Sequence, residues 1–359
     1  MTEHPPKFPF ADTDSRTERR EKLEKVYNTL EALGLPSRPE MRQEEITGNE
    51  AVESDTSPIA RDGCPNVIIG LPHAGEYAPE SLKDRLTEEG TETLALTDLG
   101  TPEIFKSKTI PWVKFGISRF VVDPNRAPEF DLDKKYEKGK APGTILWTKG
   151  AKFGPMYKED MQPTAEEAEN WAERYYLPYY NTVMGAVGAM ADKRQNRKEE
   201  RILLVDGHSF PVTADTKTWY DHYGIPDPEM MPMFILGTRD GEGCDDDIIE
   251  AFEKALKTNY ESLPEDEKKL ISEDIKGELF IRNYYMKGVH NVKFWGGAGR
   301  NMGVNALQIE CNERAYMDRP KSGDWKDFSY NEQKMAIMHS LIEKTCLDID
   351  QLLKGQTKQ

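Results

Sequence analysis

A series of short apolar runs limits the possible folds of this chain more than any other feature of its sequence. Short continuous runs rich in valine, isoleucine and leucine are typical of buried strands. They lie at 66–71, 112–123, 201–209, 233–238, 277–283 and 304–311. Apolar residues at helical spacing occupy stretches between and after them, at 164–194, 245–260 and 330–353. Strands that alternate with helices predict an α/β fold of three layers (α/β/α), in which helices cover both faces of a mixed, mostly parallel sheet.

The first 63 residues differ in character from the rest of the chain. Residues 14–36 have the apolar spacing of an amphipathic helix, and the stretch that follows them is polar and aperiodic. We therefore expect an N-terminal helix and extended arm over residues 1–63. Residues 64–359 are expected to form a single α/β domain, which is within the size range of one large domain.

Charge and composition exclude several classes of partner. The chain has 48 Lys and Arg against 64 Asp and Glu, a net charge of −16, so we expect neither nucleic acid nor an anionic membrane as a partner. No stretch approaches the ~18 apolar residues of a membrane span, and the N-terminus lacks the apolar core of a signal peptide. The four cysteines contain no Cys-x-x-Cys, which favours reduced thiols and a cytoplasmic protein. No feature of the sequence specifies an oligomeric state.

Two apolar runs each lead to a histidine. His73 follows the run "VIIGLP" and His208 follows "ILLVDG". Ligands bind open α/β sheets at the carboxyl ends of strands, and Glu76 stands three residues after His73. Two histidines and one glutamate are normal zinc ligands that leave a coordination position open, so these three residues form a candidate metal site. The alternative is a histidine that caps its strand and a solvated glutamate.

A third apolar run, "VNALQIEC", carries Glu310. With strand alternation Gln308 and Glu310 share one face, while Leu307 and Ile309 point to the other. A carboxylate on a buried strand is costly unless it is paired or functional. Glu310 is therefore either a general base or one partner of an ordinary ion pair.

The stretch "SRFVVDPNR" supplies positive charge, and an acidic chain needs a local arginine cluster if it is to bind an anion. Arg119 and Arg126 can bind a carboxylate through paired N–H groups, and Asp123 and Asn125 lie between them. The alternative is a turn in which Asp123 and Pro124 have their usual roles.

Five motifs, in this order along the chain, resemble one known family. They are "LPHAG", "TDLG", "SRFVVDPNR", "DGHS" and "GVNALQIECNERAYM", between about residues 66 and 318. They are similar to the N-formylglutamate amidohydrolase (deformylase) family, which is related in fold to the zinc carboxypeptidases. The resemblance implies a zinc-carboxypeptidase-like (phosphorylase/hydrolase-like) fold and a metallohydrolase domain over 64–359. Ala74 departs from the "PHSG" that is usual in the family.

The resemblance also implies roles for individual residues. His73, Glu76 and His208 match the ligands of one Zn²⁺, although another divalent metal would suit the same donors. Glu310 matches the glutamate that activates water, and Arg119 matches the arginine that polarises the scissile carbonyl.

Four further residues match the family's substrate-binding motifs. Asn125 and Arg126 match the pair that holds a substrate carboxylate, and Asp98 and Asp123 are motif residues assigned to substrate binding. The expected substrate is therefore a small N-acyl amino acid, such as N-formylglutamate. The sequence leaves two other functions open: a carboxypeptidase-like metallopeptidase, and a non-catalytic binding protein that retains the fold.

Overall fold

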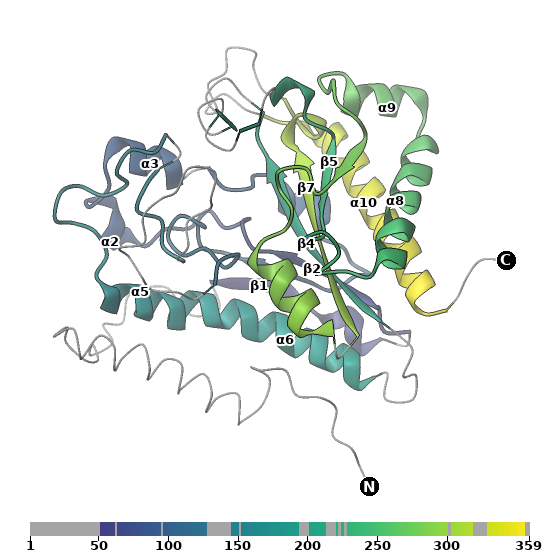
Figure 1. Ribbon diagram of the computed structural model, residues 1–359, viewed down its shortest axis with the longest axis horizontal. Helices are drawn as coiled ribbons and strands as arrows, with labels where there is room; N and C mark the ends of the chain where they lie inside the picture. Colours follow the sequence, from purple (N-terminus) through teal and green to yellow (C-terminus); the bar gives the residue numbers. More distant parts are fainter. Residues whose placement is uncertain are drawn as a thin grey trace, which may run out of the picture.

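A computed structural model describes residues 51–127, 145–193, 201–212, 220–318 and 329–355, apart from residues 62, 95, 151, 222–223, 226–227 and 301–302. These residues form a seven-stranded sheet in the order β1-β3-β2-β4-β7-β5-β6, shown in Figure 1. Its strands are β1 (Val52–Asp55), β2 (Val67–Leu71), β3 (Trp112–Phe115), β4 (Ile202–Phe210), β5 (Phe234–Gly237), β6 (Phe280–Arg282) and β7 (Val304–Asn312). The pairs β1–β3 and β7–β5 are antiparallel and the other neighbouring pairs are parallel, which confirms a mixed, mostly parallel sheet.

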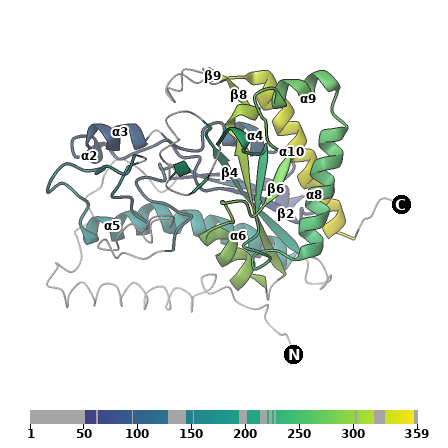
Figure 2. The same ribbon diagram turned by 45° about the horizontal axis from the view of Figure 1, so that its top comes forward.

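Helices cover the two faces of this sheet, as the two views in Figures 1 and 2 show. One face carries α4 (Thr101–Phe105), α8 (Asp246–Glu261) and α10 (Glu332–Leu353), and the other carries α6 (Leu177–Asp192) and the π-helical segment η4 (Val292–Ala298). The remaining elements are η1 (Ser57–Ala60), α2 (Glu80–Lys83), α3 (Glu88–Leu94), α5 (Ala165–Trp171), η2 (Ala172–Tyr176), η3 (Pro228–Met230), α9 (Glu265–Ser272), η6 (Glu313–Ala315), and a two-stranded sheet of β8 (Met317–Asp318) and β9 (Ser329–Tyr330).

Strand alternation divides the apolar residues between two cores. Leu203 and Val205 of β4 point into the core beneath α8 and α10, while Ile202 and Leu204 point into the core beneath α6. Because successive side chains of a strand face opposite ways, every central strand must be apolar on both faces. This requirement explains the continuous apolar runs in the sequence, and it places Asp206 and His208 on the α6 side of β4.

The structure extends or modifies several of the expected elements. The edge strand β1 lies within the predicted arm and pairs with β3, so the sheet begins before residue 64. The stretch 112–123, which we expected to hold two short strands or one bent strand, contains the single short strand β3, which ends at Phe115. The expected helix at 164–194 consists of α5, the π-helical segment η2 and α6, and Pro178 lies in the first turn of α6. The helix expected at 14–36 lies outside the described residues. No helix among the described residues is long and apolar enough to cross a membrane.

Candidate active site

Four polar side chains lie on one face of two neighbouring strands. In the parallel pair β4–β7, Asp206 is opposite Gln308 and His208 is opposite Glu310. All four are buried. The apolar residues that precede them on the same face belong to the core beneath α6, so the polar group begins where that core ends. Two adjacent strands thereby place a histidine beside a carboxylate without any contribution from a loop.

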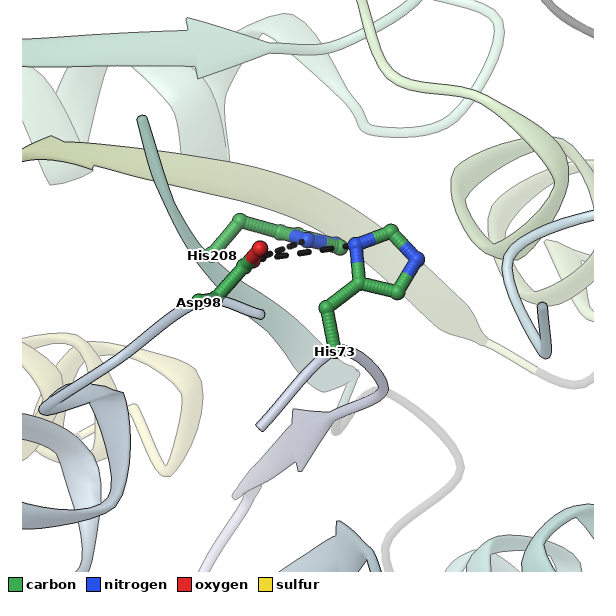
Figure 3. Close-up of side chains that lie close together, drawn as sticks. All are labelled: His73, Asp98 and His208. Atoms are coloured by element: carbon green, nitrogen blue, oxygen red, sulfur yellow. Dashed lines mark hydrogen bonds and ion pairs between the residues drawn. The ribbon is translucent and has the colours of Figure 1, made fainter. Parts of the chain in front are cut away.

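His73 and Asp98 complete a compact cluster with His208, shown in Figure 3. The ligand atoms of these three residues lie within 4.8 Å of one another. His73 follows β2, and its carbonyl oxygen accepts a hydrogen bond from the backbone N–H of Asp98 (3.0 Å). Asp98 Oδ2 lies 3.1 Å from Nδ1 of His208 and 3.7 Å from Nδ1 of His73. Both imidazole rings therefore present the same nitrogen to a single carboxylate oxygen.

Each histidine also contacts a carboxylate of its own through the other ring nitrogen, Nε2. Nε2 of His73 is 2.8 Å from Asp123 Oδ1, and Nε2 of His208 is 3.0 Å from Asp206 Oδ2. Histidines that bind metals usually donate their other ring N–H to a carboxylate, which fixes the tautomer and the orientation of the ring. In the part of the chain that the structure describes, no group hydrogen-bonds to Nδ1 of His73, although this atom is buried. A buried nitrogen without a hydrogen bond is costly, and Asp98 Oδ2 at 3.7 Å is too far away to form one. A divalent cation bound between them would remove that cost. The donor set therefore fits a metal.

Glu76 lies outside this cluster, contrary to the prediction that it joins His73 and His208. Its side chain is exposed, and the carboxylate of the cluster is that of Asp98. Three-residue spacing brings two side chains together in a helix, but the segment after His73 is a turn that becomes extended, with Tyr77 paired to Ile117. At Gly75 an added Cβ would lie 2.2 Å from the carbonyl oxygen of Ile117. This close backbone approach sets the course of the turn, and Glu76 faces outwards.

The charged groups of the cluster shift one another's pKa values. Burial opposes ionisation of Asp98, but His73 and His208 outweigh it and hold the pKa of Asp98 below its usual value. Burial also opposes charge on His208, yet Asp206, Asp98 and Glu310 raise its pKa well above the usual value. Burial raises the pKa of Glu310 to about 7, with His208 and Arg119 opposing the shift and Asp98 adding to it. A carboxyl group with a pKa near neutrality can both accept and return a proton.

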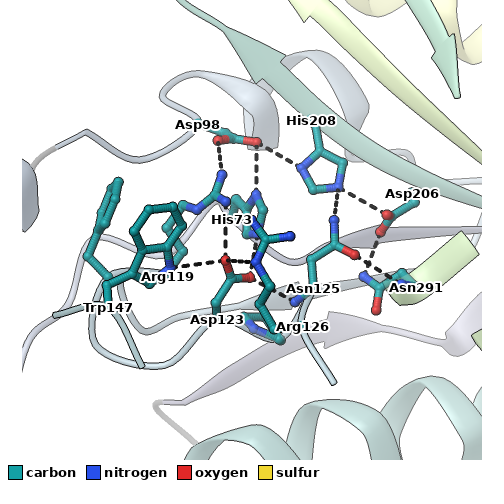
Figure 4. Close-up of polar contacts among 12 residues, drawn as sticks. His73, Asp98, Arg119, Asp123, Asn125, Arg126, Trp147, Asp206, His208 and Asn291 are labelled. Carbon is teal, nitrogen blue, oxygen red and sulfur yellow. Dashed lines mark hydrogen bonds and ion pairs between the residues drawn. The ribbon is translucent and has the colours of Figure 1, made fainter. Parts of the chain in front are cut away.

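Three of the four residues expected to bind substrate, Asp123, Asn125 and Arg126, lie with Arg119 on the segment after β3, next to the cluster (Figure 4). The fourth, Asp98, belongs to the cluster itself. Arg119 Nη2 donates to Asp123 Oδ2 (3.1 Å), and Arg119 Nη1 is 3.8 Å from Asp98 Oδ1. Nε of Arg126 lies 3.5 Å from Asp123 Oδ2. The fully buried Asp123 also accepts from the backbone N–H of Asn125 (2.9 Å). The structure thus brings both arginines and Asn125 together around Asp123.

Three residues of the site did not stand out in the sequence. Asp206 precedes His208 by two residues, so strand alternation places both on one face and is a signal that could have identified it. The indole N–H of Trp147 donates to Asp123 (3.1 Å), and its ring lies 5.4 Å from the guanidinium carbon of Arg119 and 5.8 Å from that of Arg126. Asn291 donates to Asp206 (2.9 Å). Trp147 and Asn291 are brought to the site by tertiary structure, and no local pattern marks them.

Comparison with known proteins gives a consistent result. The family model for N-formylglutamate amidohydrolase matches residues 66–317. The chain is 25% identical to an N-formylglutamate deformylase of Pseudomonas putida, with 80% of this chain and 91% of the relative covered. It is also 25% identical to the N-formylglutamate deformylase of Pseudomonas aeruginosa, with 77% and 91% covered. Its fold is similar to the crystal structure of an N-formylglutamate amidohydrolase from Ralstonia eutropha, with a TM-score of 0.59, 22% identity and coverage of 81% of this chain and 95% of the other.

Proposed function

Because the chain belongs to the N-formylglutamate amidohydrolase family, we propose that it is a metal-dependent amidohydrolase that removes the formyl group from an N-formylated acidic amino acid such as N-formylglutamate. The observation that carries the proposal is the convergence of Nδ1 of His73 and His208 on Asp98 Oδ2, with Asp123 and Asp206 behind the two rings. His73, Asp98 and His208 would hold one Zn²⁺, so Asp98 takes the place that the sequence suggested for Glu76. When bound, the ion would polarise the formyl carbonyl and acidify a water molecule.

Glu310 is the general base of the proposed reaction. It lies opposite His208 in the sheet and has a pKa of about 7. It takes a proton from water as the new C–O bond forms, and it gives that proton to the nitrogen when the C–N bond breaks. Gln308 donates a hydrogen bond to Glu310 Oε1 (2.6 Å) and orients the carboxylate. The products are formate and the free amino acid.

Arg119, Asn125 and Arg126 bind the substrate in this proposal. Burial opposes the charge of Arg119, but Asp123, Asp98 and Glu310 raise its pKa, so it remains a cation that can stabilise negative charge on the formyl oxygen. Asn125 Nδ2 lies 3.3 Å from Nε2 of His208. If Nε2 of His208 is protonated and donates its hydrogen bond to Asp206, it does not accept one from Asn125. The amide N–H groups of Asn125 then remain available to a substrate carboxylate. Arg126 supplies the positive charge that such a carboxylate requires.

The test is hydrolysis of N-formylglutamate, N-formylaspartate and a short unblocked peptide by the purified chain, before and after chelation. We expect activity on the formyl amino acids that disappears with chelator and returns with zinc. Activity on the peptide alone would favour a metallopeptidase, and activity that is indifferent to chelator would exclude the proposed mechanism.

A variant of the base gives a second test. Glu310→Gln should lower kcat by roughly 10²–10⁴-fold, the usual contribution of a general base, while the chain still binds zinc. Glu253→Gln is the matched control, because Glu253 pairs with Arg282 away from the site (2.7 Å) and its loss should leave kcat unchanged. If Glu310→Gln retains at least half of the wild-type kcat, Glu310 is not the base.

A further inference from the structure

Asn291 makes three hydrogen bonds at the start of the π-helical segment η4. Two of them lead to residues of the site, Asp206 and Asn125 (Figure 4). Its Nδ2 donates to Asp206 Oδ1 (2.9 Å), its Oδ1 accepts from the hydroxyl of Tyr180 (2.6 Å), and its backbone N–H donates to Asn125 Oδ1 (3.0 Å). The residue is 1% exposed. Buried hydrogen bonds of this kind hold side chains in one arrangement, because a broken bond leaves a buried polar atom unsatisfied.

The hydrogen-bonding partners of Asn291 and Asn125 determine the orientation of each side-chain amide. An ionised carboxylate only accepts hydrogen bonds, so Asp206 requires the NH₂ end of Asn291. A backbone N–H only donates, so Asn291 requires the carbonyl end of Asn125. The NH₂ end of Asn125 must then lie on the opposite side, where it contacts His208. That end is the one a substrate carboxylate would need.

Asp206 extends the same chain of contacts to the metal site. One of its oxygens accepts from Asn291 and the other contacts Nε2 of His208. Asn291 therefore lies between a residue expected to bind the substrate and the carboxylate that orients a candidate metal ligand. Figure 4 shows Asn125, Asn291, Asp206 and His208 as a closed ring of contacts.

We propose that Asn291 is a positioning residue that sets the orientation of Asn125 and of the Asp206–His208 pair together, so that the carboxylate-binding and metal-binding halves of the site form as one unit. The proposal rests on the proposed function. It predicts that a change at Asn291, which touches neither metal nor substrate, weakens the binding of both.

The experiment is the substitution Asn291→Ala in the full chain, with two readouts. Zinc affinity is measured on the metal-free protein by competition with a chromogenic chelator, and KM for N-formylglutamate is measured at saturating zinc. Loss of a carboxylate behind a metal-binding histidine typically weakens metal binding 10–100-fold. Asn291→Ala removes only the hydrogen bond that holds the Asp206 carboxylate, so zinc affinity should fall about tenfold. Asn291→Ala keeps the backbone N–H that holds Asn125, but it removes the side-chain bonds to Asp206 and Tyr180 that fix this backbone position. KM should therefore also rise, by a few-fold.

Asn259→Ala is the matched control. Asn259 is also a buried asparagine, and its Nδ2 contacts Thr345 Oγ1 (3.3 Å) and Asp348 Oδ2 (3.0 Å) between α8 and α10. This variant should lose stability without a change in zinc affinity or KM. Tyr180→Phe is a milder second variant: it removes the hydroxyl, which contacts both Asn291 Oδ1 and the carbonyl oxygen of Pro124 (2.9 Å), but keeps the ring stacked on Trp295. It should shift both readouts in the same direction by a smaller factor.

Two results would overturn the proposal. If Asn291→Ala and Tyr180→Phe lower thermal stability but change neither readout, Asn291 is only structural. If zinc affinity changes while KM does not, or the reverse, the two halves are not coupled through this residue. Failure of the proposed function is distinguishable from both, because the wild-type chain would then show no zinc-dependent hydrolysis of N-formylglutamate.

Discussion

Trp147 touches both arginines of the site and the carboxylate between them. A guanidinium near an indole ring is stabilised by about 0.5–2 kcal/mol, depending on its exposure, and the indole N–H adds a hydrogen bond to the charged Asp123. We expect Trp147→Leu to raise KM for N-formylglutamate by roughly tenfold. Trp147→Phe keeps an aromatic face and should raise KM by only a few-fold. Steady-state kinetics at saturating zinc measure both.

Trp112→Leu controls for the loss of a large buried ring. Trp112 lies in β3 with the ammonium of Lys106 4.4 Å from the centre of its ring, and it belongs to the core beneath α8 and α10, whereas Trp147 belongs to the core beneath α6. The control should lower thermal stability and leave KM unchanged. Equal KM values for Trp147→Leu and the wild type would show that the indole does not orient the arginines.

The sequence predicted some of the site's neighbours and missed others for a physical reason. His208 and Glu310 lie on adjacent strands, and strand alternation alone places each side chain on a definite face. His73 follows β2 and meets His208 because β2 and β4 are neighbours. Glu76 lies shortly after β2, whereas Asp98 lies between α3 and α4. The close backbone contact between Gly75 and Ile117 turns Glu76 outwards. That contact joins segments far apart in sequence, so residue spacing did not reveal it.

At the scale of elements, buried strands were easier to predict than exposed ones. The central strands β2, β4 and β7 are buried at every residue, which produces the continuous apolar runs. The edge strand β1 has the sequence "VESD" and exposes its two central residues, so it carries no apolar signal. Its place in the sheet is set by pairing with β3, a tertiary contact that the sequence does not show.

Helix α5 contains a buried carboxyl group that should make stability depend on pH. Glu169 is 2% exposed, and in the part of the chain that is described no group hydrogen-bonds to its Oε1. Burial, with help from Glu173 and Glu166, raises its pKa from 4.5 to about 7. The folded state thus keeps a proton that the unfolded state has lost between pH 4.5 and 7, so this group's contribution to stability falls as pH rises through that range.

We therefore expect Glu169→Gln to leave stability near pH 4.5 almost unchanged and to increase it at pH 8 by up to about 3 kcal/mol. Urea unfolding of both chains at the two pH values measures the difference. Glu166→Gln is the control, since it removes a neighbouring charge but leaves Glu169 buried, and it should have a smaller effect. A Glu169→Gln chain that is less stable than the wild type at pH 8 would contradict the raised pKa.

At the scale of the whole molecule, the proposed metal ligands join three segments of the chain. His73 follows β2, Asp98 precedes α4, and His208 lies in β4. An ion that binds the folded state and not the unfolded state stabilises by about 3–4 kcal/mol when its concentration is 100–1,000 times its Kd. For a chain of this size, zinc should raise the midpoint of thermal unfolding by roughly 5 °C over the chelated protein. Scanning calorimetry with zinc and with chelator measures this shift.

His208→Ala should abolish the shift, because it leaves only two of the three donors to hold the ion. His339→Ala should retain it, since His339 lies in α10 with Glu343 as its contact (3.6 Å). The same midpoint with zinc and with chelator in the wild-type chain would show that the cluster is held by its own hydrogen bonds and does not bind the ion.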